Sequence, residues 1–155
     1  MQRLTMRKTS LPLLFTIVAL VGLLTGCSKE KTPPISERIA KIWTARIVEE
    51  NTVVVYSRGV TNPAPVRPTY SNFRLDLSSA PTVRYTEFDG NTFVGQYTVT
   101  DSKLTLTSLN PQPTGTTGTI EFTINSISDN ELVLTRSSQS QKTGNTTNKY
   151  TLSNP

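Results

Sequence analysis

TVRYTEFDGNTFVGQYTVT, residues 82–100, is the stretch that decides the fold class. Apolar and polar residues alternate on both sides of Asp89-Gly90-Asn91, a tripeptide that is typical of the tight turn between two antiparallel strands. Because successive side chains of a strand point to opposite faces, one face of this hairpin is expected to carry Val83, Tyr85, Phe93, Tyr97 and Val99. The stretch therefore predicts a β-hairpin with one buried face.

The same period of two continues along the chain on both sides of this hairpin. Turn signals interrupt it roughly every 8–12 residues, which is the pattern of a β-sandwich or a β-barrel. The expected strands are 43–49, 52–56, 72–78, 82–88, 92–100, 103–108, 119–128, 131–137 and a last short strand around Tyr150 and Leu152. Most are joined by short turns, so the sequence predicts an all-β, antiparallel up-and-down meander that closes into a small barrel of about eight strands. A two-sheet sandwich is the alternative, although it usually needs more long crossover loops than this chain offers.

One stretch has helical rather than strand periodicity. Between Pro34 and Lys41, and just beyond, Ile35, Ile39 and Ile42 recur at helical spacing. This stretch makes only about two turns. It predicts a short N-terminal helix that plugs one end of the barrel.

The first 26 residues have the organisation of a secretory signal peptide. Arg3, Arg7 and Lys8 precede an apolar run from Leu11 to Leu24. As a helix this run would span about 21 Å, which is too short for the roughly 30 Å hydrocarbon core of a bilayer. The segment is therefore expected to direct export rather than to span the membrane.

The leader ends in Leu24-Thr25-Gly26-Cys27, which resembles the lipobox of bacterial lipoproteins. In that family, cleavage before the Cys is accompanied by acylation of its thiol and of the new amino terminus. The resemblance implies a membrane anchor on Cys27, and three acyl chains make such an attachment effectively permanent. The expected organisation is a signal peptide at 1–26, the lipidated Cys and a tether at 27–34, and the β domain at 35–155. The resemblance also implies an outer-membrane lipoprotein of the cell envelope, on either the periplasmic face or the cell surface.

The composition excludes several classes of function. The chain has no His and one Cys, so the usual general base and thiolate zinc clusters are missing. It has 16 Lys and Arg against 11 Asp and Glu, but three of the basic residues belong to the leader. No basic run is interleaved with aromatic residues, as it would be in a nucleic-acid binding protein. We therefore expect no nucleic-acid partner, no metal and no cofactor.

The acidic residues give no sign of catalysis. A hydrolase without His needs paired carboxylates with different pKa values or an activated nucleophile. Near the middle of the chain the acids are Asp76, Glu87 and Asp89, and their positions are typical of a solvated strand face and a turn. The sequence predicts a protein that is not an enzyme.

A short helical plug, a Trp that opens the first strand and a meander of hairpins resemble the lipocalin-like (calycin) domain of small bacterial lipoproteins. The resemblance covers residues 36–153, and it is carried by the Trp43 strand and by residues 73–78, 89–97, 103–106, 131–135 and 150–152. The family favours Gly two residues before the Trp, whereas this chain has Lys41-Ile42-Trp43. In the wider superfamily a late-strand Arg lies across that Trp, and Arg136 is the candidate here. The alternative is that Trp43 is an ordinary core residue and Arg136 a solvated strand end.

The resemblance implies binding of a small hydrophobic or amphipathic molecule inside the barrel. A set of inward aromatic residues either lines a ligand pocket or fills the interior: Phe73, Tyr85, Phe93, Tyr97 and Phe122. Gly95, in the same inward row, favours a void or a bend of the strand at that level. A second hypothesis is a protein–protein interaction module, either an enzyme inhibitor or an accessory subunit of an envelope complex. It would act through the loops at 57–70 and 109–118 and use the barrel as a solid scaffold.

Overall fold

Nine strands and one short α-helix make up residues 32–155, the part of the chain that this computed structural model describes; the leader and Cys27 lie outside it. The helix is α2 (Ile35–Ile39), and the strands are β1 (Ile42–Glu50), β2 (Val53–Ser57), β3 (Arg74–Ser79), β4 (Thr82–Thr86), β5 (Thr92–Val99), β6 (Lys103–Asn110), β7 (Ile120–Ile127), β8 (Glu131–Arg136) and β9 (Asn148–Ser153). Two short 3-10 helices, η1 (Pro68–Asn72) and η2 (Gln141–Thr143), lie in loops. Within residues 32–155, no helix has the length and apolar character needed to cross a membrane.

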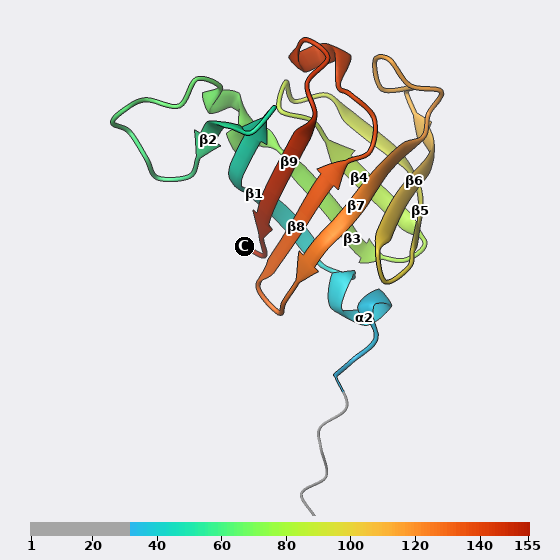
Figure 1. Ribbon diagram of the computed structural model, residues 1–155. Helices are drawn as coiled ribbons and strands as arrows, with labels where there is room; N and C mark the ends of the chain where they lie inside the picture. The colour runs from blue at the N-terminus through green and yellow to red at the C-terminus, as the bar shows by residue number, and fades with distance from the viewer. Residues whose placement is uncertain (1–31) are drawn as a thin grey trace, which may run out of the picture. The chain divides into compact units, whose positions relative to one another are not determined.

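The strands close on themselves. Each strand from β3 to β9 pairs antiparallel with the next, and β1 completes the ring by pairing with both β3 and β9. The pairs Trp43↔Leu75 and Val48↔Tyr150 set the register at the two seams. The result is a closed eight-stranded up-and-down barrel made of β1 and β3–β9 (Figure 1). The predicted meander and its closure are confirmed, and the sandwich alternative is wrong.

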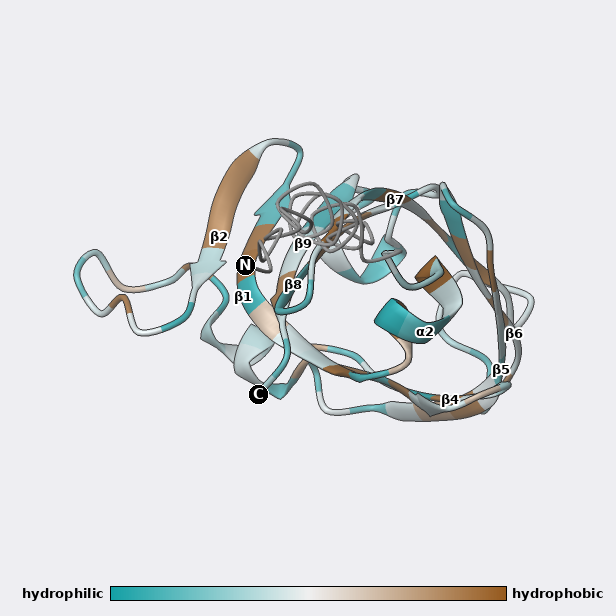
Figure 2. Cartoon of the chain, turned by 90° about the horizontal axis from the view of Figure 1, so that it is seen from below, coloured by the Kyte–Doolittle hydropathy of each residue, from teal (hydrophilic) through white to brown (hydrophobic). Residues whose placement is uncertain are grey.

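The remaining strand, β2, lies outside this ring. It pairs with β1 alone, through Ile47–Glu50, and the register shifts between Val48 and Glu49. Figure 2 shows β2 standing away from the barrel wall, with hydrophobic residues along it. The strand expected at 52–56 therefore exists, but it extends the sheet outward from the barrel.

Helix α2 lies under one end of the barrel (Figure 1, Figure 2). Ile39 is fully buried, and the indole nitrogen of Trp43 donates a hydrogen bond of 2.9 Å to its carbonyl oxygen. Arg38 donates a hydrogen bond of 2.5 Å to the carbonyl oxygen of Ile127 on β7. The helix ends at Ala40, whose φ of −70° and ψ of 62° are not helical, so it is shorter than the predicted segment. These contacts confirm that it covers one end of the barrel.

The inward rows of the strands form one continuous core, as the alternation predicts. Every residue expected to point inward from β3 to β8 is at most 8% exposed, apart from Gly95 and Val99: Phe73, Leu75, Leu77, Val83, Tyr85, Phe93, Tyr97, Leu104, Leu106, Ile120, Phe122, Ile124, Leu132 and Leu134. Burial of this apolar surface, at about 25 cal/mol per Å², is the main term that stabilises the fold.

Gly95 has a different role from the one expected. A Cβ at this position would clash with the carbonyl oxygen of Thr107 and lie 3.0 Å from the backbone nitrogen of Leu109. Glycine therefore permits a close approach of β5 and β6, at the point where their register shifts between Val94 and Gln96. Of the two alternatives expected at Gly95, the void is wrong, whereas the irregular register agrees with a bend.

Trp43 and Arg136 lie at opposite ends of the barrel. Val48, Tyr150 and Leu134 are paired across β1, β9 and β8 and so share one level. Trp43 precedes this level by five residues toward α2, whereas Arg136 lies two residues beyond it in the other direction. At about 3.3 Å per residue the two are separated by roughly 20 Å along the strands. The expected cation–π contact between them is therefore wrong. Trp43 is a core residue, as the alternative held, but Arg136 is 3% exposed and is not a solvated strand end.

Candidate functional site

The five aromatic residues predicted to bind a ligand all lie in the barrel core, and four of them are in mutual contact. The ring of Tyr85 lies 5.7 Å from Phe73, 6.1 Å from Phe93 and 6.5 Å from Phe122, measured between ring centroids. Tyr97 is apart from this group, and its hydroxyl donates a hydrogen bond of 3.0 Å to the carbonyl oxygen of Leu77.

Tyr150, which the sequence suggested only as part of the last strand, completes the aromatic layer. Its ring stacks on Phe73 with centroids 4.8 Å apart and meets Phe122 edge-on at 6.1 Å. Burial is the main cause that raises the pKa of Tyr150 to about 12 and the pKa of Tyr85 well above 10. These rings form one buried aromatic layer across the middle of the barrel.

A polar layer closes the end of the barrel opposite α2. Four inward positions at or just beyond strand ends are polar and buried: Glu50, Glu87, Arg136 and Asn148. None of these four residues was predicted from the sequence to share a buried polar layer. The period-two alternation of the strands does indicate that two of them point inward. Arg136 follows Leu132 and Leu134 on the inward row of β8, and Asn148 precedes Tyr150 and Leu152 on the inward row of β9.

Glu50 is the centre of one half of this layer. Its carboxylate pairs with Arg67 at 2.7 Å and accepts a hydrogen bond of 2.9 Å from the hydroxyl of Tyr70 in η1. Asn148 donates to the hydroxyl oxygens of both Tyr70 and Tyr150, at 3.3 and 3.2 Å. Burial, together with the nearby Glu50 carboxylate, raises the pKa of Tyr70 far above its usual value. This half is fully hydrogen-bonded and fixes η1 against β1 and β9.

Lys142 of η2 organises the other half. Its ammonium group lies 2.5 Å from Glu87 and 2.7 Å from Asp89, and 5.6 Å from the centre of the Phe93 ring. The contact with Glu87 Oε2 is an ion pair without hydrogen-bond geometry, because that oxygen has no hydrogen-bond partner among the described residues. Burial alone would raise the pKa of Asp89 and lower that of Lys142. The hydrogen bonds between the two outweigh burial, so the pKa of Asp89 is lowered and the pKa of Lys142 is raised.

Replacing Lys142 with Met should lower the free energy of unfolding by about 2 kcal/mol at neutral pH, because it leaves the buried Glu87 carboxylate unpaired. Because the pKa of Asp89 is lower in the folded than in the unfolded state, ionised Asp89 stabilises the fold above the unfolded-state pKa of about 3.9. This contribution is lost as the pH falls through the folded-state pKa of Asp89. Because the pKa of Lys142 is higher in the folded state, protonated Lys142 stabilises the fold below the unfolded-state pKa of about 10.4. This contribution is lost as the pH rises through the folded-state pKa of Lys142. Urea titrations across this pH range should show that the difference in free energy of unfolding between wild type and variant shrinks at both extremes.

A matched Lys103→Met variant breaks only the exposed 3.1 Å pair with Glu121 and should have almost no effect on the free energy of unfolding. Equal effects of the two variants would contradict the role assigned to Lys142.

The acidic residues do not form a catalytic pair. Asp76 is half-buried on the outer face of β3, where it bonds Ser78 and lies 3.6 Å from Arg74. Burial opposes ionisation of Asp76, but the hydrogen bonds from Ser78 outweigh it and lower the pKa. The expectation of a solvated Glu87 is wrong, because this side chain is 5% exposed and paired with Lys142. Residues 32–155 contain no group of three or more His, Cys, Asp or Glu that could hold a metal ion.

The two loops proposed as interaction surfaces differ. Loop 109–118 folds back on itself through the bond from Leu109 N to Gly118 O and the bond from the Thr116 hydroxyl to Pro113 O. It also packs on η2, because a Cβ at Gly115 would lie within 2.6–2.8 Å of the Gln141 side chain. Loop 109–118 thus supports the polar end of the barrel.

Loop 57–70 carries an exposed apolar surface together with β2. A pocket of about 300 Å³ is lined by residues 54–57, Val60 and residues 63–66, and we call it the β2 pocket. Around it, Val66 is 76% exposed, Val53 61% and Val54 55%. The bond from Arg67 N to Val55 O ties the end of the loop back to β2. The sequence identified this loop by its prolines, but it did not indicate that the exposed valines gather there.

Comparisons with known proteins add little to this picture. No family model and no curated protein matches the chain. A crystal structure of a lipocalin-like protein from Bacteroides uniformis is similar at 14% identity and a TM-score of 0.48, over 76% of this chain and 99% of that one. An uncharacterized protein from Bacteroides eggerthii is similar at 13% identity and a TM-score of 0.45, over 74% and 98%. The fold class therefore rests on the strand order itself: a closed antiparallel barrel with one extra strand and one short helix.

Proposed function

We propose that this protein is a non-enzymatic binding protein of the cell envelope that holds a partner protein at the β2 pocket. The observation that carries the proposal is the contrast between a packed barrel interior and an exposed apolar surface on a strand outside the barrel. Exposed apolar patches of this kind mark interaction sites in soluble domains.

The anchor at Cys27 belongs to the same proposal. Its support is the leader and the lipobox-like Leu24-Thr25-Gly26-Cys27, followed by a short tether. Within the β domain, the chain enters at α2, whereas β2 pairs with the half of β1 farther from α2. The β2 pocket thus lies away from the point where the tether joins, which favours a partner protein over the bilayer as its occupant.

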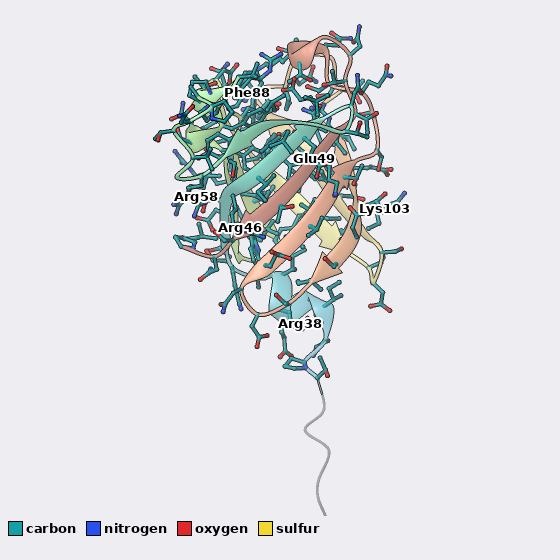
Figure 3. All side chains as sticks on the ribbon, turned by 60° about the vertical axis from the view of Figure 1, so that its left-hand side comes forward. Arg38, Arg46, Glu49, Arg58, Phe88 and Lys103 are labelled. Atoms are coloured by element: carbon teal, nitrogen blue, oxygen red, sulfur yellow. The ribbon has the colours of Figure 1, made fainter. Side chains whose placement is uncertain are left out.

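Charge indicates what kind of partner segment fits. Loop 58–67 has no acidic residue and is bounded by Arg58 and Arg67. Arg67 is neutralised by Glu50. Arg58 donates hydrogen bonds to the Ala45 carbonyl and to Ser153, yet it forms no ion pair within residues 32–155. Arg46 lies on the same side of the molecule as Arg58 (Figure 3) but is paired with Glu131, so, among the residues described, Arg58 is the cation of this side that is left for a partner. An apolar segment flanked by Asp or Glu suits this surface.

A photo-crosslinking residue at Val66 in the intact envelope tests the proposal. We expect one discrete protein adduct, whose linked peptide carries apolar residues beside an acidic one. Adding Val60→Asp should lower the yield of this adduct about tenfold, since a buried charge in an apolar contact costs more than 1.4 kcal/mol. The control position is Val94, another exposed valine, on β5 and 46% exposed. Equal labelling from position 94, or crosslinks to lipid alone, would refute the proposal.

A further inference from the structure

Arg136 is a buried cation without a partner. Its side chain points into the barrel at the polar end and is 3% exposed. Its Nε is completely buried and has no hydrogen-bond partner among the residues that the structure describes. The two terminal nitrogens are not completely buried, and the guanidinium forms no ion pair with a described residue. An uncompensated buried charge costs several kcal/mol, so this arrangement requires a compensating group.

The groups around Arg136 do not supply one. Arg136 is paired with Phe122 across β7 and β8, and the Phe122 ring lies 6.5 Å from the ring of Tyr85 and 6.1 Å from that of Tyr150. Burial raises the pKa of both phenols, and the charge of Arg136 opposes this effect. Glu87 is buried two residues after Tyr85, and its charge raises the pKa of the same two phenols. Its carboxylate is nonetheless held by Lys142 at 2.5 Å and does not pair with Arg136.

A second unsatisfied donor lies beside the first. The hydroxyl of Tyr85 is not bonded to a described residue and, unlike Arg136 Nε, is not one of the completely buried atoms without a partner, whereas the Tyr150 hydroxyl accepts a bond from Asn148. Burial keeps the pKa of Tyr85 far above neutrality, so its phenol is protonated and can donate. A guanidinium on β8 and a phenol on β4 thus offer donors without acceptors at one level of the barrel.

We propose that Arg136 and Tyr85 bind a carboxylate group at the polar end of the barrel, beneath the loop that carries η2. The planar guanidinium fork matches the two oxygens of a carboxylate. Glu87 adds negative charge to the same space, which favours a monoanion over a dianion such as phosphate. The carboxylate comes either from a small free acid or from the end of a longer molecule. This site is separate from the β2 pocket and does not depend on the function proposed for it.

The test uses the full-length protein in nanodiscs and carboxyl-¹³C-labelled acetate and hexanoate. We expect a saturable change in the ¹³C signal, weakened about tenfold or more in Arg136→Met, because a charge-assisted hydrogen bond contributes about 1.5–3 kcal/mol. Tyr85→Phe should weaken binding by a smaller factor, and Arg46→Met, on the outer face of β1, should not change it. Binding of acetate identifies a small acid as the ligand class, whereas binding of hexanoate alone identifies the end of a longer molecule.

Three results would overturn the site. They are the absence of a saturable change with either acid at millimolar concentration, tighter binding of inorganic phosphate, and equal binding of hexanol. Stability gives an independent readout. Without any carboxylate, Arg136→Met should melt at or above the temperature of the wild type, since a buried unpaired charge has been replaced by an apolar side chain. A variant that melts well below the wild type would instead show that a protein group already satisfies Arg136.

Discussion

Replacing Trp43 with Ala lowers the free energy of unfolding by about 4 kcal/mol, the range observed when a large buried side chain is truncated. Trp43 is fully buried at the α2 end of the barrel, and its indole nitrogen is bonded to the Ile39 carbonyl. The substitution therefore removes a core side chain from β1 and also the bond that holds the helix under the barrel.

The two losses are separated by Trp43→Phe. This variant keeps an aromatic ring in the core but removes the indole donor, so it should cost about 1–2 kcal/mol, the value of one buried hydrogen bond and a small cavity. Trp43 is the single Trp of the chain, so urea unfolding of both variants is followed by far-ultraviolet circular dichroism. An Ala variant within about 1 kcal/mol of the wild type would show that the end of the barrel repacks without Trp43.

The strand order could be predicted from the sequence because period-two alternation and turn residues are local signals. Val83, Tyr85 and Phe93 alternate with polar residues around Asp89-Gly90-Asn91, and the hairpin they predict is present with Tyr85 opposite Phe93. Closure followed from counting strands joined by short turns. These signals sufficed because each strand from β3 to β9 pairs with the next in sequence, and β1, which also pairs with β3 and β9, closes the barrel.

The place of β2 could not be predicted, since its residues have the same strand propensity as those of a barrel strand. Its burial pattern does not alternate: Val53 and Val54 are exposed, whereas Val55 and Tyr56 are buried. Val48 pairs with Tyr56 and Glu49 with Val54, so the register shift leaves Val55 of β2 as an extra residue without a partner on β1. The irregularity thus lies in β2 itself, but period-two counting along the sequence does not detect a bulge.

The polar layer was hidden for a different reason. Glu50, Arg136 and Asn148 lie at strand ends, where a charged or polar residue is usually solvated. Counting in steps of two from Leu134 or Tyr150 would have placed Arg136 and Asn148 inside. Lys142 could not have been found in this way, because it comes from the loop between β8 and β9 and reaches a turn about 50 residues earlier.

Replacing Gly95 with Ala should lower the free energy of unfolding by about 3 kcal/mol, at the upper end of the cost of overpacking a core. The atoms that an added Cβ would meet belong to the β6 backbone, at Thr107 and Leu109, rather than to a flexible side chain. The clash can therefore be relieved only if β6 moves away from β5, and β6 is held on its other side by β7, with Leu106 opposite Ile120.

The matched control is Gly90→Ala. Gly90 has a φ of +86° with no atom within 4 Å of an added Cβ, so this substitution tests backbone conformation alone and should cost about 1 kcal/mol. Urea unfolding followed by Trp43 fluorescence measures both variants against the wild type. If Gly95→Ala costs no more than Gly90→Ala, β5 and β6 separate easily and the barrel wall is plastic at that point. A clearly larger cost means that the wall is rigid there, as a scaffold that presents the β2 pocket must be.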